Sequence, residues 1–206
     1  FFELLEKRHL NWREITDTQR NQLVEESVAK AMEEYQTTVF DSSARNKSMA
    51  GRIRRMTDRT LWALGCQWEH GAYEKTWHEL DFGRAGGNGV TLPVEEGLEL
   101  SLRGRIDRVD FAEEDGSLYV KVIDYKSGST KLDLGKVYYG LQLQLAVYLD
   151  AAMELEQKKH PGKQVEPAGV FYYHIDDPML DQEEDETDEA WGRRMLKALR
   201  MDGLVN

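Results

Sequence analysis

The sequence predicts an α/β fold in which a mixed β-sheet is flanked by helices, with extra helices in the amino-terminal part. Apolar residues recur at helical spacing over 17–35 and about 48–76, which is typical of amphipathic helices. Further along the chain the apolar period shortens to two, as in strands with one buried face. A helix over 141–155 separates a strand over 118–125 from a strand over 168–175. Such a strand–helix–strand connection favours a parallel pair, so we expect the sheet to be mixed.

Local signals justify the individual elements. Thr16 or Asp17 can cap the first long helix, because both side chains accept hydrogen bonds from the free amides of a first turn. A short strand over 77–82 is followed by closely spaced glycines, which predict a flexible hairpin loop: Gly83, Gly86, Gly87 and Gly89. From Leu98 onward apolar and polar residues alternate, and we expect one strand that continues to Phe111.

Length and composition indicate one globular domain. The chain has 206 residues, 40% of them hydrophobic, which is enough for one core and too little for a motor plus a second ordinary domain. Within a single domain over 1–206 we expect a helical part over 1–76, a catalytic α/β core over 77–178, and an acidic loop with a carboxy-terminal helix over 179–206. The first residues resemble the end of an amphipathic helix, so we expect the chain to be part of a larger protein.

The remaining composition excludes several classes of protein. A single cysteine, Cys66, cannot form an internal disulfide or a four-thiolate metal site, and it suits a reducing compartment. No apolar run approaches the roughly 18 to 20 residues that span a bilayer, and no signal-peptide pattern opens the sequence. We therefore expect a cytoplasmic protein that does not bind a membrane.

The charge is unevenly distributed along the chain. The formal net charge is −11, but seven of the acidic residues lie within 181–189, where a solvated loop is the simplest interpretation. Residues 41–60 instead hold six basic and two acidic residues, a local excess that matters more for phosphate binding than the global sum. Three of these side chains, at helical spacing, are candidate contacts to DNA phosphates: Arg52, Arg55 and Arg59. An ordinary solvated helix face explains them equally well.

Two neighbouring strands carry the candidate catalytic and metal-binding residues. Asp107 lies on one strand of the predicted hairpin, and Asp124 and Lys126 lie at the end of its partner, on the same face because side chains alternate along a strand. Two carboxylates that share a site repel each other unless a cation lies between them, and hard oxygen ligands suit Mg²⁺ or Mn²⁺. A lysine beside such an ion can orient a water molecule or neutralise phosphate oxygens. The chemistry indicated is phosphodiester hydrolysis, unless Arg105 and Arg108 simply pair with these acids at the surface.

Three sequence blocks together resemble a known family. They are Gly-Arg-Ile-Asp-Arg-Val-Asp over 104–110, Ile-Asp-Tyr-Lys-Ser-Gly over 123–128, and the run from Tyr139 to Leu149. Their spacing is similar to the RecB-like branch of the PD-(D/E)xK nucleases, and within it to the carboxy-terminal domain of AddB proteins of AddAB-type helicase–nucleases. The resemblance implies a restriction-endonuclease-like core.

The resemblance also implies roles for individual residues. It assigns Asp107 and Asp124 as metal ligands, Tyr125 as a ligand through its main-chain carbonyl, and Lys126 as the catalytic lysine. It further assigns the branch's Gln-x-x-x-Tyr motif to Gln144 and Tyr148, which stand four apart on a helix and therefore on one face. Without the resemblance, Gln144 would be interpreted as an exposed helix glutamine. Arg105, inside the first block, is a further candidate for DNA contact.

The function implied is that of a Mg²⁺- or Mn²⁺-dependent DNA exonuclease in double-strand break repair and recombination, working beside an AddA-type helicase–nuclease subunit. Two other interpretations stay open: another RecB-like nuclease of phage or CRISPR-associated type, and a non-catalytic module that binds DNA ends with a nuclease fold. Activity in the presence of a divalent ion separates the enzyme from the module.

The sequence departs from the family pattern at two places. The family has a histidine block on the helix before this chain begins, and none of the five histidines matches it. AddB proteins also hold a 4Fe–4S cluster through four cysteines; Cys66 matches none of them, so we expect no cluster here. Weak activity or low stability is the expected consequence. Glu79 resembles a family glutamate on the first strand that approaches the metal, although a surface acid is the simpler interpretation.

Overall fold

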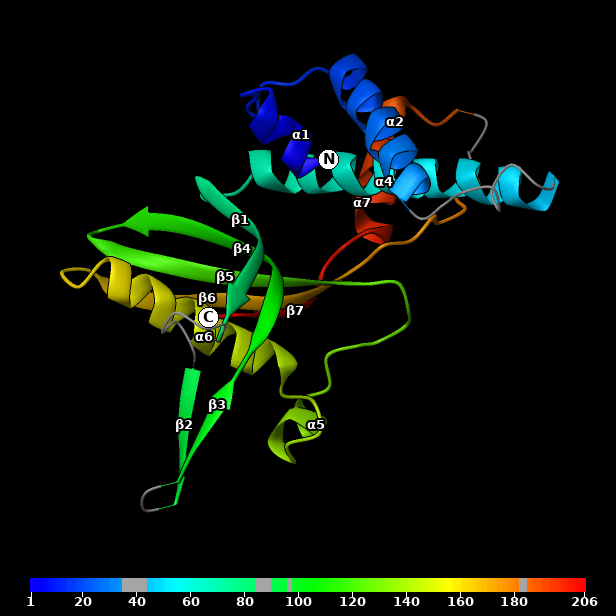
Figure 1. The fold of residues 1–206 in the computed structure, drawn as a ribbon. Coiled ribbons are helices and arrows are strands. Elements are labelled where there is room, and N and C mark those ends of the chain that lie inside the picture. Colours follow the sequence, from blue (N-terminus) through cyan, green and yellow to red (C-terminus); the bar gives the residue numbers. More distant parts are fainter. Residues whose placement is uncertain (35–43, 84–89, 96–97, 182–184) are drawn as a thin grey trace. The chain divides into compact units, whose positions relative to one another are not determined.

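The chain forms two units, each with its own internal contacts. The computed structural model describes residues 1–34, 44–83, 90–95, 98–181 and 185–206. Unit 1 consists of Phe1–Gly71 and Ile175–Arg200, and unit 2 consists of Ala72–His174 and Met201–Asn206. Unit 1 is helical and unit 2 contains the sheet (Figure 1). The expected glycine loop over 84–89 lies outside the described residues.

Unit 1 is built from helices along the part of the chain that the structure describes. They are α1 (Phe2–Lys7), α2 (Asp17–Glu34), α4 (Ala44–Glu69) and α7 (Asp188–Ala198). One apolar cluster joins Val24 and Val28 of α2 to Leu61 of α4, and a second joins Ala63 of α4 to Met195 of α7. None of the described helices is both long and apolar enough to cross a membrane.

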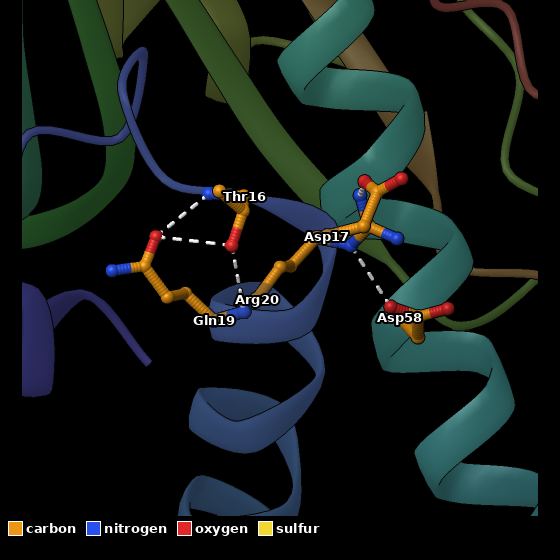
Figure 2. A network of polar contacts seen from close by, with 5 residues as sticks. All are labelled: Thr16, Asp17, Gln19, Arg20 and Asp58. Atoms are coloured by element: carbon orange, nitrogen blue, oxygen red, sulfur yellow. Dashed lines mark hydrogen bonds and ion pairs between the residues drawn. The ribbon is translucent and has the colours of Figure 1, made fainter.

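Helix α2 begins at a reciprocal cap. The Thr16 hydroxyl accepts a hydrogen bond from the Gln19 amide at 3.2 Å, and the Gln19 side-chain oxygen accepts one from the Thr16 amide at 2.8 Å. This is a capping box, and it satisfies two amides that the first turn leaves without partners. Arg20, one residue further, binds Asp17 at 2.6 Å and Asp58 of α4 at 2.9 Å, so it links the two helices (Figure 2). Of the two caps that the sequence allowed, Thr16 is the one used.

Unit 2 is built on a five-stranded mixed sheet. Its strands, in spatial order, are β1 (Lys75–Phe82), β4 (Gly104–Glu114), β5 (Ser117–Lys126), β6 (Gln164–His174) and β7 (Asp202–Val205). The β5–β6 pair is parallel and the other three pairs are antiparallel. A separate hairpin consists of β2 (Val90–Glu95) and β3 (Leu98–Leu102), and the helices are α5 (Leu134–Tyr138) and α6 (Gln144–Lys159). The α/β class and the mixed sheet predicted from the sequence are confirmed.

Helix α6 supplies the crossover between the two parallel strands and covers one face of the sheet (Figure 1). Val109 of β4 and Val120 and Val122 of β5 are fully buried there. They pack in one cluster with Ala151 and Leu155 of α6. Alternate residues of β4 and β5 therefore face this helix, which fixes where the polar residues at the strand ends point.

Several element boundaries differ from the sequence prediction. The expected strand over 98–111 is two strands, because β3 pairs only with β2 in the hairpin whereas β4 pairs with β1 and β5 in the main sheet. Helix α4 ends at Glu69 rather than 76, since Glu74 already donates its amide to Phe111 at 2.9 Å and so extends the sheet pairing.

The second half of the chain holds further differences. Helix α6 begins at Gln144 rather than 141, because Gln142 uses its side chain to hold the preceding loop. Strand β6 begins at Gln164 rather than 168. The short helix α5 and the edge strand β7 were not expected; both are too short for a periodic signal.

Candidate active site

Strands β4 and β5 bring the three central residues together. Arg108 lies opposite Ile123 in the antiparallel register, so Asp107 and Asp124 come next to each other across the two strands. The carboxylate of Asp107 accepts a hydrogen bond from the Tyr125 amide at 2.8 Å. The position of Asp107 is therefore fixed by the backbone of the strand that carries the second carboxylate.

Asp124 is the most buried of these acids, at 3% exposure. Its Oδ1 accepts a hydrogen bond from Gln144 Nε2 at 2.9 Å, and its Oδ2 lies 2.7 Å from Lys126 Nζ. Among the described groups none donates a well-aligned hydrogen bond to Oδ2. Burial raises the pKa of Asp124; the lysine opposes this rise and the charge of Asp107 adds to it.

Lys126 lies between the acid and the helix. Its ammonium group donates to Gln144 Oε1 at 2.9 Å and lies 5.3 Å from the centre of the Tyr172 ring on β6. Burial works against the charge, but the neighbouring Asp124 outweighs it and raises the pKa of Lys126. The lysine is therefore protonated and held in place by an acid, an amide and an aromatic face.

Gln144 links Asp124, Lys126 and Tyr148. It stands in the first turn of α6, and its two amide atoms bind the two opposite charges, oxygen to Lys126 and nitrogen to Asp124. The same nitrogen lies 3.0 Å from the Tyr148 hydroxyl, one turn further along α6. The Tyr148 ring packs edge-on against Phe82 of β1 at 5.9 Å. The Gln-x-x-x-Tyr pair thus faces the two strand residues, as the helical spacing predicted.

The side chain of Tyr125 lies on the opposite face of the sheet. Its ring packs edge-on against Tyr173 at 6.0 Å, and burial raises its pKa. On the same face Arg108 binds Asp110 at 2.7 Å, and Lys121 binds the other oxygen of Asp110, also at 2.7 Å. Only the main chain of Tyr125 can therefore take part in the site on the α6 face.

Arg105 and Glu79 form an ion pair beside the site. Their side chains are 2.7 Å apart and both are 59% exposed. Glu79 lies between the register pairs His78↔Arg108 and Leu80↔Ile106, opposite Asp107, and its φ of 54° is a left-handed backbone conformation within β1. An exposed pair of this kind contributes little stability, so either side chain is available for another contact.

The donor set fits a hard divalent cation. Within the described part of the chain no three His, Cys, Asp or Glu side chains gather around one point. The site therefore offers the carboxylates of Asp107 and Asp124, and the main chain of Tyr125, whose amide donates to Asp107, follows Asp124 directly. Mg²⁺ is commonly bound by one or two carboxylates, with water and phosphate oxygens in the other positions. The buried Oδ2 of Asp124 lies 2.7 Å from Lys126 Nζ, so an ion bound by this oxygen would lie beside the lysine.

Residues 3–202 match the family model of the PD-(D/E)XK nuclease superfamily. The chain belongs to this superfamily. Nucleases of this superfamily generally use divalent metal ions, which agrees with the donor set at the ends of β4 and β5. The assignment of the pattern's two acids and lysine to Asp107, Asp124 and Lys126 stays a prediction.

Known relatives of this PD-(D/E)XK chain are named as a subunit of an ATP-dependent helicase/deoxyribonuclease. The chain is 42% identical over 206 residues to the protein of Lachnoclostridium phytofermentans, covering 100% of this chain and 17% of the relative. It is 37% identical over 208 residues to that of Alkaliphilus metalliredigens, covering 100% and 18%. For Caldanaerobacter subterraneus subsp. tengcongensis the identity is 38% over 206 residues, covering 98% and 17%. The chain thus spans less than a fifth of the length of these relatives.

The three candidate arginines lie in unit 1 of this PD-(D/E)XK chain, on α4. Arg52 is exposed. Arg59 forms an ion pair with Asp177 and donates to the Pro178 carbonyl at 3.2 Å, while Arg55 lies 3.6 Å from the same aspartate. Asp177 therefore competes with any phosphate for two of the three. Their role in DNA binding stays a prediction.

Some residues of the site had no signal in the sequence. Tyr172 contacts the catalytic lysine candidate only because β6 lies parallel to β5, a pairing that sets Asp124 opposite Tyr172. Arg108 and Asp110 belong to the block over 104–110, but they form an ion pair with each other on the face of the sheet opposite α6. The alternation of side chains along β4 separates them from Asp107. A strict two-residue count through 104–110 is the signal that separates the two faces.

Proposed function

We propose that this domain is a divalent-metal-dependent deoxyribonuclease that hydrolyses phosphodiester bonds, with Mg²⁺ as its ion and with exonuclease action on DNA ends. The observation that carries the proposal is the linkage of a buried carboxylate, Asp124, to Lys126 and Gln144, beside the second carboxylate of Asp107. Burying such charges costs free energy, so their convergence at a strand end favours a functional use over a structural one.

The residues divide the work of hydrolysis among them. Asp107, Asp124 and the main-chain carbonyl of Tyr125 would hold the ion. When bound, a divalent ion stabilises charge on the phosphate oxygens and lowers the pKa of a water ligand. Lys126 has ammonium protons to donate to the attacking water or to a non-bridging phosphate oxygen. Gln144 holds that ammonium group at 2.9 Å and so fixes its direction.

The relatives support a wider context. Their name joins a helicase to a deoxyribonuclease. We propose by analogy that this domain acts on DNA delivered by an AddA-type helicase–nuclease subunit, during double-strand break repair and recombination in the cytoplasm. Arg52, Arg55, Arg59 and Arg105 are proposed contacts to DNA phosphates. Arg55 and Arg59 would exchange Asp177 for phosphate, and Arg105 would exchange Glu79.

Cleavage of linear DNA with Mg²⁺ or Mn²⁺ tests the proposal. We expect degradation that needs the ion, and we expect Asp124→Ala and Lys126→Ala each to lower the rate at least about a hundredfold, because each removes a group that acts on the developing charge. The matched controls are Asp150→Ala and Lys158→Ala on α6, which remove the same charges away from the site. Product formation is followed on gels with end-labelled DNA.

Two outcomes contradict the proposal. Undiminished degradation by Asp124→Ala would show that the acids are structural. Tight binding of DNA ends without hydrolysis, with either ion, would instead favour the non-catalytic end-binding module. Circular single-stranded and duplex substrates, tested beside linear ones, separate the exonuclease from an endonuclease.

A further inference from the structure

The segment between β5 and α6 exposes an unusual number of large apolar side chains. We call residues 131–143 the tyrosine segment. Tyr138 is 84% exposed, Tyr139 76% and Leu141 77%. Leu134, at 57%, and Leu143, at 47%, extend the same surface. Contiguous exposed apolar side chains are uncommon on proteins that stay free in water, and they mark sites of interaction.

The tyrosine segment is held in a defined conformation. Asp133 caps α5 by accepting a hydrogen bond from the Lys136 amide at 3.1 Å. The side chain of Gln142 binds the main chain at the start of the segment: its oxygen accepts a hydrogen bond from the Asp133 amide at 2.8 Å, and its nitrogen donates one to the Lys131 carbonyl at 2.9 Å. The Leu132 amide donates to Asp202 of β7 at 2.8 Å. These hydrogen bonds hold the main chain that carries the exposed rings.

Along the chain, this segment lies between two residues of the candidate active site. The segment follows Lys126 and precedes Gln144, and those two side chains are hydrogen bonded at 2.9 Å. α5 lies beyond the amino-terminal end of α6 and off the sheet (Figure 1). The two tyrosines thus belong to a segment that joins two residues of the proposed phosphodiester site along the chain.

The charge of this region indicates the class of ligand. The tyrosine segment holds two lysines, Lys131 and Lys136, and one acid, Asp133, so it is locally basic although the whole chain carries a net charge of −11. Asp133 is already engaged in capping α5. Exposed aromatic rings interleaved with lysines match single-stranded nucleic acid, whose bases stack on rings while its phosphates attract cations. A duplex keeps its bases stacked within itself and offers nothing to the rings.

We propose that Tyr138 and Tyr139 form a stacking platform for the unpaired bases of single-stranded DNA next to the active site. The two rings are 5.2 Å apart and nearly perpendicular, at 84°, so they present different faces to successive bases. The proposal rests on DNA being the substrate and adds that the strand enters the site unpaired. The domain then prefers single-stranded over duplex DNA.

Binding of fluorescein-labelled oligothymidylate, and of a duplex of equal length, tests the platform by anisotropy in EDTA, where no cleavage occurs. We expect Tyr138→Ala/Tyr139→Ala to weaken single-strand binding by about tenfold or more and to leave duplex binding within about twofold. Tyr138→Phe/Tyr139→Phe keeps the rings and should bind like the unchanged chain. Tyr138→Leu/Tyr139→Leu keeps apolar area without rings and should bind like the alanine variant.

The control is Met179→Ala, which removes a side chain that is 95% exposed in unit 1 and should change neither affinity. Three outcomes overturn the platform: unchanged single-strand affinity in the alanine variant, equal losses for single strand and duplex, or full binding by the leucine variant. The last would indicate an apolar surface for a protein partner.

Cleavage is measured in parallel so that this proposal and the nuclease proposal fail separately. If the unchanged chain cleaves DNA with Mn²⁺ and the alanine variant retains its preference for single strands, only the platform is wrong. If the unchanged chain does not cleave DNA and the alanine variant binds single strands more weakly than the unchanged chain, only the nuclease proposal is wrong.

Discussion

At the scale of single residues, one neutral side chain organises the charged ones. Gln144 offers an oxygen to Lys126 and a nitrogen to Asp124, so its amide is oriented by its neighbours and orients them in return. No charged residue could do both, because a carboxylate would repel Asp124 and an ammonium group would repel Lys126. This explains why a glutamine stands at a position that otherwise resembles an exposed helix surface.

Removal of this amide should affect the rate of catalysis more than DNA binding. We expect Gln144→Ala to lower kcat for DNA hydrolysis by about tenfold to a hundredfold, as supporting residues of metal sites commonly do, with little change in KM. Gln144→Glu should be no better, because its charge displaces Lys126 from Asp124. Gln22→Ala, on the exposed face of α2, is the matched control. A purely structural role for Gln144 would instead lower thermal stability and leave kcat of the folded fraction unchanged.

At the scale of elements, the edge strand β7 supports the tyrosine segment. β7 pairs with β6, and its Asp202 accepts the hydrogen bond from Leu132. The close approach of these strands depends on Gly169, since a β-carbon there would lie 2.6 Å from the Leu204 carbonyl oxygen. The sequence offered no periodic signal for a strand of four residues, yet this strand holds the loop beside the site.

Gly169→Ala tests this dependence. We expect the unfolding free energy to fall by about 1–3 kcal/mol, because the backbone of β7 must move away from the added methyl group. Gly162→Ala is the control, since no atom lies within 4 Å of a β-carbon at that position. Urea unfolding followed by circular dichroism gives both values. Equal stability of the two variants would mean that β7 pairs loosely and does not brace the segment.

The parts of the fold that could be predicted are those with a repeating pattern. The two-residue alternation along β5 placed Asp124 and Lys126 on one face, and the helical spacing placed Gln144 over Tyr148. The break between β3 and β4 could not be predicted, because both strands alternate and only pairing partners separate them. The tyrosine segment follows no period; Gln142 and Asp202, distant in sequence, determine its conformation.

At the scale of the whole molecule, the sheet of unit 2 carries the candidate active site on one face and buried charged residues on the other. On the second face, burial opposes the charge of Asp110, but Arg108 and Lys121 outweigh it and hold the pKa of Asp110 below its usual value. Breaking such a buried pair by removing one partner is strongly destabilising. His78 lies opposite Arg108 in the β1–β4 register and shares this environment. The stability of the domain should therefore depend on the protonation of a residue that the catalytic site does not use.

His78 makes the stability of the domain fall in mild acid. Burial, reinforced by the charge of Arg108, lowers the pKa of His78 from 6.5 to about 4. Below pH 6.5 the unfolded chain binds a proton that the folded chain takes up only near pH 4, so the unfolding free energy decreases as the pH falls through this window. For this one group the loss between pH 7 and pH 5 is about 2 kcal/mol.

The variant His78→Gln cannot take up this proton, so its stability should change less between the same two pH values. We expect the difference between the unchanged chain and the variant, measured by urea unfolding, to shrink by about 2 kcal/mol from pH 7 to pH 5. His9→Gln, which removes an exposed imidazole in unit 1, is the matched control. Because the carboxylates titrate in both proteins alike, their contribution cancels in the comparison. Parallel curves for the unchanged chain and His78→Gln would show that the imidazole takes up its proton equally readily in the folded and unfolded states, so that burial does not lower its pKa.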